Sequence, residues 1–128
     1  MEINLSTKPL TALLLASFYI FAGLYHFINP EFYLKLIPDY IPASVFMNYF
    51  VGFLELLLGV LVLFPNSRKM ACQAIIVLLV LLIPSHVYFI QIGSCVSNGL
   101  CVPNWVSWSR LIIIHPLLIS WAYFVSKT

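Results

Sequence analysis

The sequence predicts an all-α integral membrane protein, a bundle of four spanning helices with a short interfacial helix in its first outer loop. Hydrophobic residues make up 62% of the chain and charged residues 8%, and the mean hydropathy is +1.04. These values lie far outside the usual range of soluble domains. Four apolar runs, each near or above the ~20 residues needed to cross a bilayer, fill almost the whole chain. A mass of 14.6 kDa leaves room for one domain, 1–128, and no separate soluble domain.

Each apolar run is bounded on at least one side by residues that disfavour continuing a helix. The four spans are expected at about 10–28, 45–64, 71–92 and 106–125. Their boundaries are Asn29-Pro30, Pro65-Asn66, Gly93 and Pro103-Asn104. A secretory signal peptide is the alternative for the first run. That run is longer than a normal signal core and no small-x-small cleavage site follows it, so we expect a retained span.

The distribution of cations predicts the orientation, because cytoplasmic loops are enriched in Lys and Arg. Four cations lie on the side of the termini: Lys8, Arg68, Lys69 and Lys127. Only Lys35 and Arg110 lie toward the other side. We therefore expect both termini in the cytoplasm, with loops 29–44 and 93–105 facing outward. In a bacterium, the expected source, the protein would lie in the inner membrane with these loops in the periplasm.

The first outer loop is more than a linker. Between Pro30 and Pro38 it is rich in aromatic and aliphatic side chains. A short helix lying at the membrane interface fits this composition. The second outer loop contains Cys95 and Cys101, whereas Cys72 lies at the opposite end of the third span.

The outer pair of cysteines is a disulfide candidate, because an extracytoplasmic loop can be oxidised. Asn98-Gly99 can form a tight turn that brings Cys95 and Cys101 together. Two free thiols are the alternative. A redox-active pair is a third interpretation, but catalytic dithiols usually have two intervening residues and this pair has five.

Ionisable residues within membrane spans are costly and are candidates for function. Five form the candidate pocket: His26, Glu55, His86, Arg110 and His115. At ~1.5 Å per residue, they lie between about 3 Å (His26) and about 16 Å (Glu55) from the outer ends of their spans. All five therefore fall in the outer half, with Glu55 nearest the midplane.

Helical spacing predicts which faces of the first two spans meet. Small or polar residues recur on one stripe of each span. These stripes comprise Ala12, Ala16, Tyr19, Gly23 and His26 on the first, and Asn48, Gly52, Glu55 and Gly59 on the second. Small residues on facing stripes allow two helices to approach closely. Arg110 and His115 are about 140° apart on a regular helix, so they share a face only if Pro116 distorts the turn.

A carboxylate near the midplane has to be neutralised or paired. By depth, Glu55 is expected to pair with Arg110 or His115. Such a pair is either an inter-helix staple or part of a pocket that opens outward. No two histidines have metal-ligand spacing such as i, i+4, so no metal site is assigned. No residue is assigned a catalytic role.

Several motifs resemble the DoxX-like family of small four-helix membrane proteins. They are the stretch AGLYHFINPEFY from Ala22 to Tyr33, Ile37-Pro38, Ile41-Pro42, the Gly52, Glu55, Gly59 pattern and Leu63-Phe64-Pro65. The resemblance covers nearly the full length and includes His26, Glu55 and Arg110. The third and fourth spans depart from it, with Pro84-Ser85-His86 and with three isoleucines before His115-Pro116.

The resemblance implies a role in membrane redox complexes, as in subunits linked to thiosulfate:quinone oxidoreductase, or in assembly of receptors. The first hypothesis is an accessory or scaffold protein that binds a lipid-like or quinone-like molecule, or a partner helix, in the outward polar pocket. The second is a subunit of a quinone-linked oxidoreductase. No cofactor is specified, with quinone and haem as the alternatives.

The expected partners are the bilayer and either another membrane protein or a second copy of the chain. A net charge of +2 gives no basic field for nucleic acid. A transporter is a third hypothesis, but four spans without broken helices in matched halves do not favour it. A transporter of this size would also need an oligomer.

Overall fold

The computed structural model describes residues 7–128, with side chains described from Leu10 onward. The helices are α1 (Thr7–Ile28), α2 (Pro30–Leu34), α3 (Ser44–Val62), α4 (Pro65–Leu81), α5 (Ile83–Gln91), α6 (Asn104–Ser109), the π-helical turn η1 (Arg110–Ile114) and α7 (His115–Ser126). Four helical segments are long and apolar enough to cross a membrane: 10–28, 44–62, 65–91 and 104–126. The predicted all-α bundle is confirmed, and α2 lies in the first outer loop as expected.

Helices α1 and α3 pack along the two stripes of small residues. A Cβ built on Gly23 would lie 2.7 Å from the Gly52 carbonyl oxygen, and one on Gly59 would lie 2.9 Å from Cγ1 of Ile20. The backbones are therefore in direct contact at these positions. The prediction that the two stripes meet is confirmed.

The third span begins earlier than its hydropathy predicts. Helix α4 starts at Pro65 and not near Ala71. Proline is favoured in the first turn of a helix, where its missing N–H is not needed. Arg68 then lies in the helix, and its Nε donates a hydrogen bond to the Val62 carbonyl oxygen at 2.9 Å. This contact satisfies a carbonyl at the C-terminus of α3.

The third and fourth spans are interrupted, contrary to the expectation of unbroken helices. The third span changes from α4 to α5 at Leu82, because Pro84 has no N–H to donate to the carbonyl four residues before it. The fourth widens into η1, where the His115 N–H donates to the Arg110 carbonyl oxygen five residues earlier. Pro116 follows directly, and a π-bulge is a known way to accommodate such a residue.

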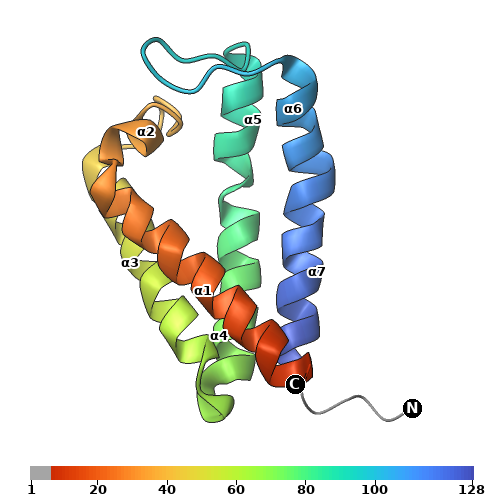
Figure 1. Ribbon diagram of the computed structural model, residues 1–128. Coiled ribbons are helices and arrows are strands. Elements are labelled where there is room, and N and C mark those ends of the chain that lie inside the picture. The colour runs from red at the N-terminus through yellow and green to blue at the C-terminus, as the bar shows by residue number, and fades with distance from the viewer. Residues whose placement is uncertain (1–6) are drawn as a thin grey trace.

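The four spans form a V. The pair α1–α3 and the pair formed by the third and fourth spans meet at the end where α1 begins and α7 ends, and they diverge toward the outer loops (Figure 1). The largest buried side chains of the core, Leu15, Val62, Ile75 and Val125, lie near the closed end. In the described chain, no Cα atom of α5 lies within 8 Å of one in α1 or α3. The outer half of the bundle is thus open between its two arms.

Candidate functional site

A cavity of about 450 Å³ lies between the two arms of the V. Its walls come from α1, α3, α4, α5 and the fourth span, and side chains of the first outer loop also line it. All five candidate residues line this cavity: His26, Glu55, His86, Arg110 and His115. Most of the remaining lining is aliphatic or aromatic, which makes the cavity an apolar chamber with a few polar groups.

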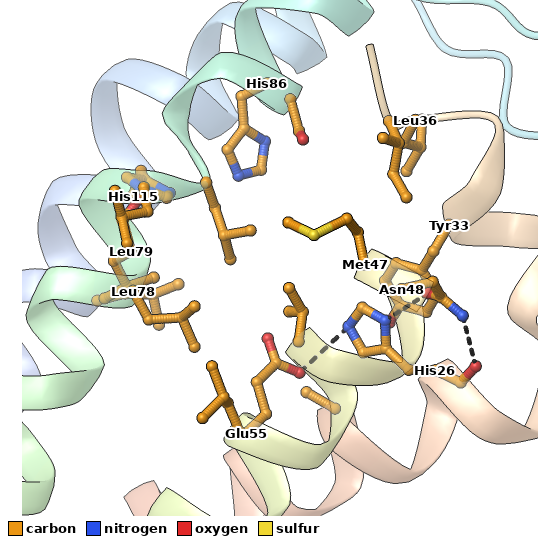
Figure 2. Close-up of a pocket in the computed structure, with 18 of the residues that line it drawn as sticks. His26, Tyr33, Leu36, Met47, Asn48, Glu55, Leu78, Leu79, His86 and His115 are labelled. Carbon is orange, nitrogen blue, oxygen red and sulfur yellow. Dashed lines mark hydrogen bonds and ion pairs between the residues drawn. The ribbon is translucent and has the colours of Figure 1, made fainter. Parts of the chain in front are cut away.

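The ion pair of the site joins α1 to α3. His26 Nε2 lies 3.3 Å from Glu55 Oε2, and both side chains are less than a tenth exposed. On its other side, His26 Nδ1 lies 2.7 Å from Oδ1 of Asn48. The Asn48 amide nitrogen in turn donates to the His26 carbonyl oxygen at 3.1 Å. Asn48 therefore holds both the backbone and the ring of His26 (Figure 2).

The expected pairing of Glu55 with Arg110 or His115 is wrong, because its partner is His26. The depth count assumed that the outer ends of the first two spans lie level. A Cβ built on Gly52 would lie 2.6 Å from Cβ of His26, so His26 is level with Gly52, less than one turn from Glu55. Helical Cα–Cβ bonds tilt toward the helix N-terminus. Because α1 and α3 are antiparallel, His26 leans toward the closed end of the bundle and Glu55 leans toward the outer loops. The two side chains meet between their backbone levels.

The Asn48 contacts determine where the protons of the pair lie. The backbone carbonyl of His26 can only accept, so the Asn48 nitrogen must face it and Oδ1 must face the ring. His26 Nδ1 is consequently the donor. With only that proton, Nε2 would present a lone pair to a carboxylate oxygen. The contact is attractive when the pair holds one further proton, on Nε2 or on the carboxyl group, and the His26–Glu55 pair is then neutral overall.

Tyr33 of α2 packs against the face of the His26 ring. The two rings are stacked, with centroids 3.6 Å apart and planes inclined by 16°. Burial raises the pKa of the Tyr33 hydroxyl from 10.0 to about 12, and the nearby Glu55 and Tyr25 add to this effect. The hydroxyl is therefore protonated at physiological pH, and it can serve as a hydrogen-bond donor at the edge of the cavity.

The two other histidines lie across the cavity from His26 (Figure 2). The rings of His86 and His115 are in edge contact, with centroids 4.8 Å apart. His115 Nε2 donates to the Leu79 carbonyl oxygen at 2.5 Å. This carbonyl lies in the last turn of α4, just before the break in the third span, where carbonyls at a helix end lack intrahelical donors. His115 thus has a structural task in addition to lining the cavity.

The π turn resolves whether Arg110 and His115 share a face. A regular helix would separate them by about 140°. The closing hydrogen bond from His115 to Arg110 spans five residues, so both residues reach the same cavity wall. Single π turns inside helices are frequent at functional sites.

Two residues were not chosen as site candidates from the sequence, although they hold the site together. Asn48 was visible as a polar residue in the stripe of Glu55, and its position within a span was a usable signal. Tyr33 gave no such signal, because its contact with His26 depends on how α2 folds back. A third residue, Tyr19, has a buried hydroxyl in the cavity wall without a hydrogen-bond partner among the described residues.

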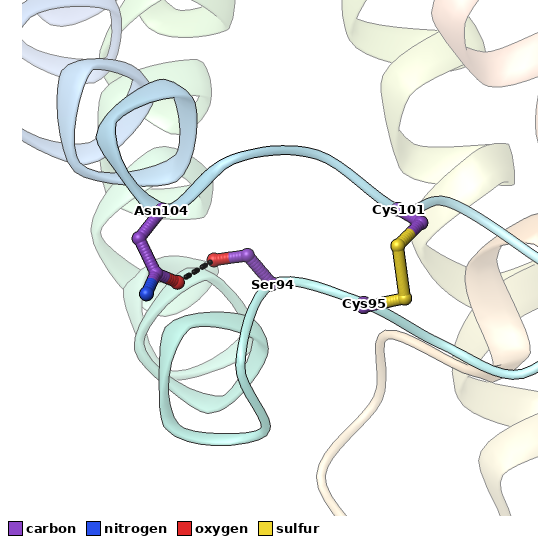
Figure 3. The surroundings of a disulfide bond; sticks show 4 residues. All are labelled: Ser94, Cys95, Cys101 and Asn104. Carbon is purple, nitrogen blue, oxygen red and sulfur yellow. Dashed lines mark hydrogen bonds between the residues drawn. A yellow bond between two sulfur atoms is a disulfide. The ribbon is translucent and has the colours of Figure 1, made fainter.

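The second outer loop is closed by a disulfide between Cys95 and Cys101 (Figure 3). Ser94, the residue before it, donates a hydrogen bond to Oδ1 of Asn104 at the start of α6, at 2.8 Å. Lys35 Nζ, from the first outer loop, donates to the Ser97 and Asn98 carbonyl oxygens at 2.7 and 3.1 Å. The two outer loops are thereby joined above the cavity.

Replacing both Cys95 and Cys101 by serine is expected to destabilise the second outer loop by about 2 kcal/mol, the loop-closure term for a short disulfide loop. The Val96 amide, which donates to the Leu100 carbonyl oxygen at 2.9 Å, should then exchange its hydrogen faster. Hydrogen-exchange mass spectrometry measures this rate. Lys35→Met is the control, because it removes the link between the loops and leaves the disulfide intact. Unchanged exchange at Val96 in the double serine variant would contradict the expectation.

Among the residues described, no group of three or more His, Cys, Asp or Glu side chains is arranged to hold a metal ion. Residues 15–126 match the family described as Domain of unknown function (DUF8561). The chain belongs to this family. No curated protein and no solved structure matches it. The matched segment contains all the residues of the cavity, so the site lies within the family's domain.

Proposed function

We propose that this DUF8561 protein is a DoxX-like accessory or scaffold protein of the membrane, which binds a lipid-like or quinone-like molecule in the cavity between its two arms. The observation that carries the proposal is the cavity itself. Its volume of about 450 Å³ lies within the range of small-molecule sites, about 300–1,000 Å³. Its lining is largely apolar, with polar groups toward the outer half of the bundle.

An amphiphile fits this lining better than an apolar partner helix does. The buried hydroxyl of Tyr19 has no hydrogen-bond partner in the described part of the chain. Covering it with apolar side chains would leave it unsatisfied, at a cost of about 1–3 kcal/mol. A ligand with a polar head can satisfy such groups while its apolar part contacts the aliphatic walls.

The proposed orientation follows from the cations. Arg68, Lys69 and Lys127 lie at the closed end of the V, and the positive-inside rule assigns that end to the cytoplasm. The open end and the disulfide loop then face the periplasm of a bacterial inner membrane. The cavity would receive its ligand through its open end, from the outer leaflet of the bilayer.

The alternative, a subunit of a quinone-linked redox complex, is favoured by one observation, the buried His26–Glu55 pair in the cavity wall. Reduction of a quinone takes up two electrons and two protons, and a pair of this kind can transfer a proton to a quinone oxygen. The electrons would come from a partner subunit. A Glu55→Gln variant that abolishes quinone reduction in the isolated complex would support this alternative over the scaffold role.

Filling the cavity tests the proposal. Ala22 lines the cavity from α1, and Ala22→Phe is expected to lower the amount of co-purifying amphiphile about tenfold or more. Extraction from protein purified in mild detergent, followed by mass spectrometry, measures the bound molecules. Val77→Phe is the control, because Val77 is 58% exposed on α4 and does not line the cavity. Equal ligand content in wild type and Ala22→Phe would refute the proposed site.

A further inference from the structure

Arg110 is the charged group of the cavity that lacks a counter-charge. It is partly buried at the start of η1 and lines the cavity. No carboxylate of the described residues lies within 4.0 Å of its guanidinium nitrogens, since the only ion pair among them joins His26 to Glu55. A cation in an apolar wall without a partner is costly, and such residues in spans mark ligand sites.

The other ionisable groups of the cavity do not supply the missing negative charge. The Glu55 carboxyl group already has a partner, because its Oε2 lies 3.3 Å from Nε2 of His26. The Tyr33 hydroxyl stays protonated, because burial raises its pKa to about 12. His86 and His115, the remaining titratable neighbours, are neutral or positive in every protonation state they adopt. Arg110 therefore has no anionic partner among the described residues of the cavity.

The geometry points to an anionic amphiphile as the ligand: a single apolar chain with one carboxylate or phosphate head, which Arg110 binds. This inference rests on the proposed function and specifies the ligand class of the same cavity. The planar guanidinium forms two parallel hydrogen bonds to a carboxylate or phosphate group. The apolar chain would lie along the aliphatic residues of α3 and α4 that line the cavity.

The apolar walls indicate a membrane lipid and not a free oxyanion. Leu78, Leu82 and Phe89 line the cavity on the arm that carries Arg110, and Met47 and Leu54 line it on the opposite arm. A free phosphate would gain nothing from these side chains, whereas burial of a chain contributes about 0.8 kcal/mol per methylene group. A fatty acid or a lysophospholipid satisfies both the charge and the walls.

Binding of two matched probes to the full-length protein in nanodiscs tests the inference. Palmitate and hexadecanol have the same chain length, and they differ in the charge of the head. Wild type is expected to bind palmitate about tenfold or more tightly than hexadecanol, as a charge-assisted pair implies. Arg110→Gln should lose most of this preference and keep its affinity for hexadecanol. Lys127→Gln, a charge removed near the C-terminus and outside the cavity, should keep the preference.

The outcomes separate this inference from the proposed function. If wild type binds hexadecanol as tightly as palmitate, the anionic head is wrong and the amphiphile site stands; this comparison needs no variant to fold. If Arg110→Gln prefers palmitate as strongly as wild type does, Arg110 is not the head-group ligand and the inference is wrong. If neither probe binds, the proposed function fails with the inference. Displacement of palmitate by equimolar inorganic phosphate would overturn the assignment to a lipid.

Discussion

Gly23→Ala is expected to lower the free energy of unfolding by about 3 kcal/mol, the upper end of the cost of overpacking a helix interface. An added Cβ at Gly23 would lie 2.7 Å from two backbone atoms of α3, the Gly52 carbonyl oxygen and the Leu56 nitrogen. Backbone cannot rotate away as a flexible side chain can. Helices α1 and α3 would have to separate, and the His26–Glu55 contact would lengthen with them.

Steric trapping or reversible denaturation in mixed micelles measures the change in stability. Gly99→Ala is the matched control, because its Cβ would meet only the side chains of Lys35 and Val96, at 3.3 Å. That variant should change the free energy of unfolding by less than about 0.5 kcal/mol, as for a surface substitution. Equal stabilities of Gly23→Ala and wild type would show that α1 and α3 are not held at backbone contact.

The four spans could be predicted from the sequence, because crossing a membrane depends on length and hydropathy, which are local properties. The meeting of α1 with α3 was also predictable. The recurrence of Gly52, Glu55 and Gly59 places small and polar groups on one face, and such a face has few stable locations other than against another helix.

The interruptions in the later spans were only partly predictable. Pro84 was visible, and the loss of its N–H gave a sufficient reason to expect the break at Leu82. Pro116 was recognised as a possible distortion, but whether a helix bends, kinks or forms a π turn before a proline depends on its neighbours. That choice decided whether Arg110 joins His115, so the composition of the cavity depended on tertiary packing.

The partner of Glu55 could not be derived from depth. Counting residues from the end of each span treats those ends as level, whereas the contact of Gly52 with His26 shows that the outer ends of α1 and α3 lie at different depths. The error affects every pair of residues on neighbouring spans of opposite direction. The register of α1 against α3, in which Gly52 lies beside His26, brings Glu55 within reach of His26.

His26→Phe is expected to destabilise the protein by about 3 kcal/mol, because removal of one partner leaves a buried charge uncompensated. Glu55 has no other partner for Oε2 among the described residues, and Asn48 loses the ring to which its Oδ1 is bonded. Phenylalanine preserves the stacking with Tyr33, so the loss reports on the polar contacts of the imidazole and not on packing.

The double variant His26→Phe, Glu55→Leu distinguishes the cost of the orphaned carboxylate from the value of the pair. We expect it to recover most of the stability lost in His26→Phe, because hydrophobic replacement of a whole buried ion pair is often neutral or stabilising. The four free energies of unfolding form a double-mutant cycle, which isolates the coupling between the two residues. A coupling near zero would show that His26 and Glu55 act independently. The pairing inferred from their 3.3 Å contact would then be wrong.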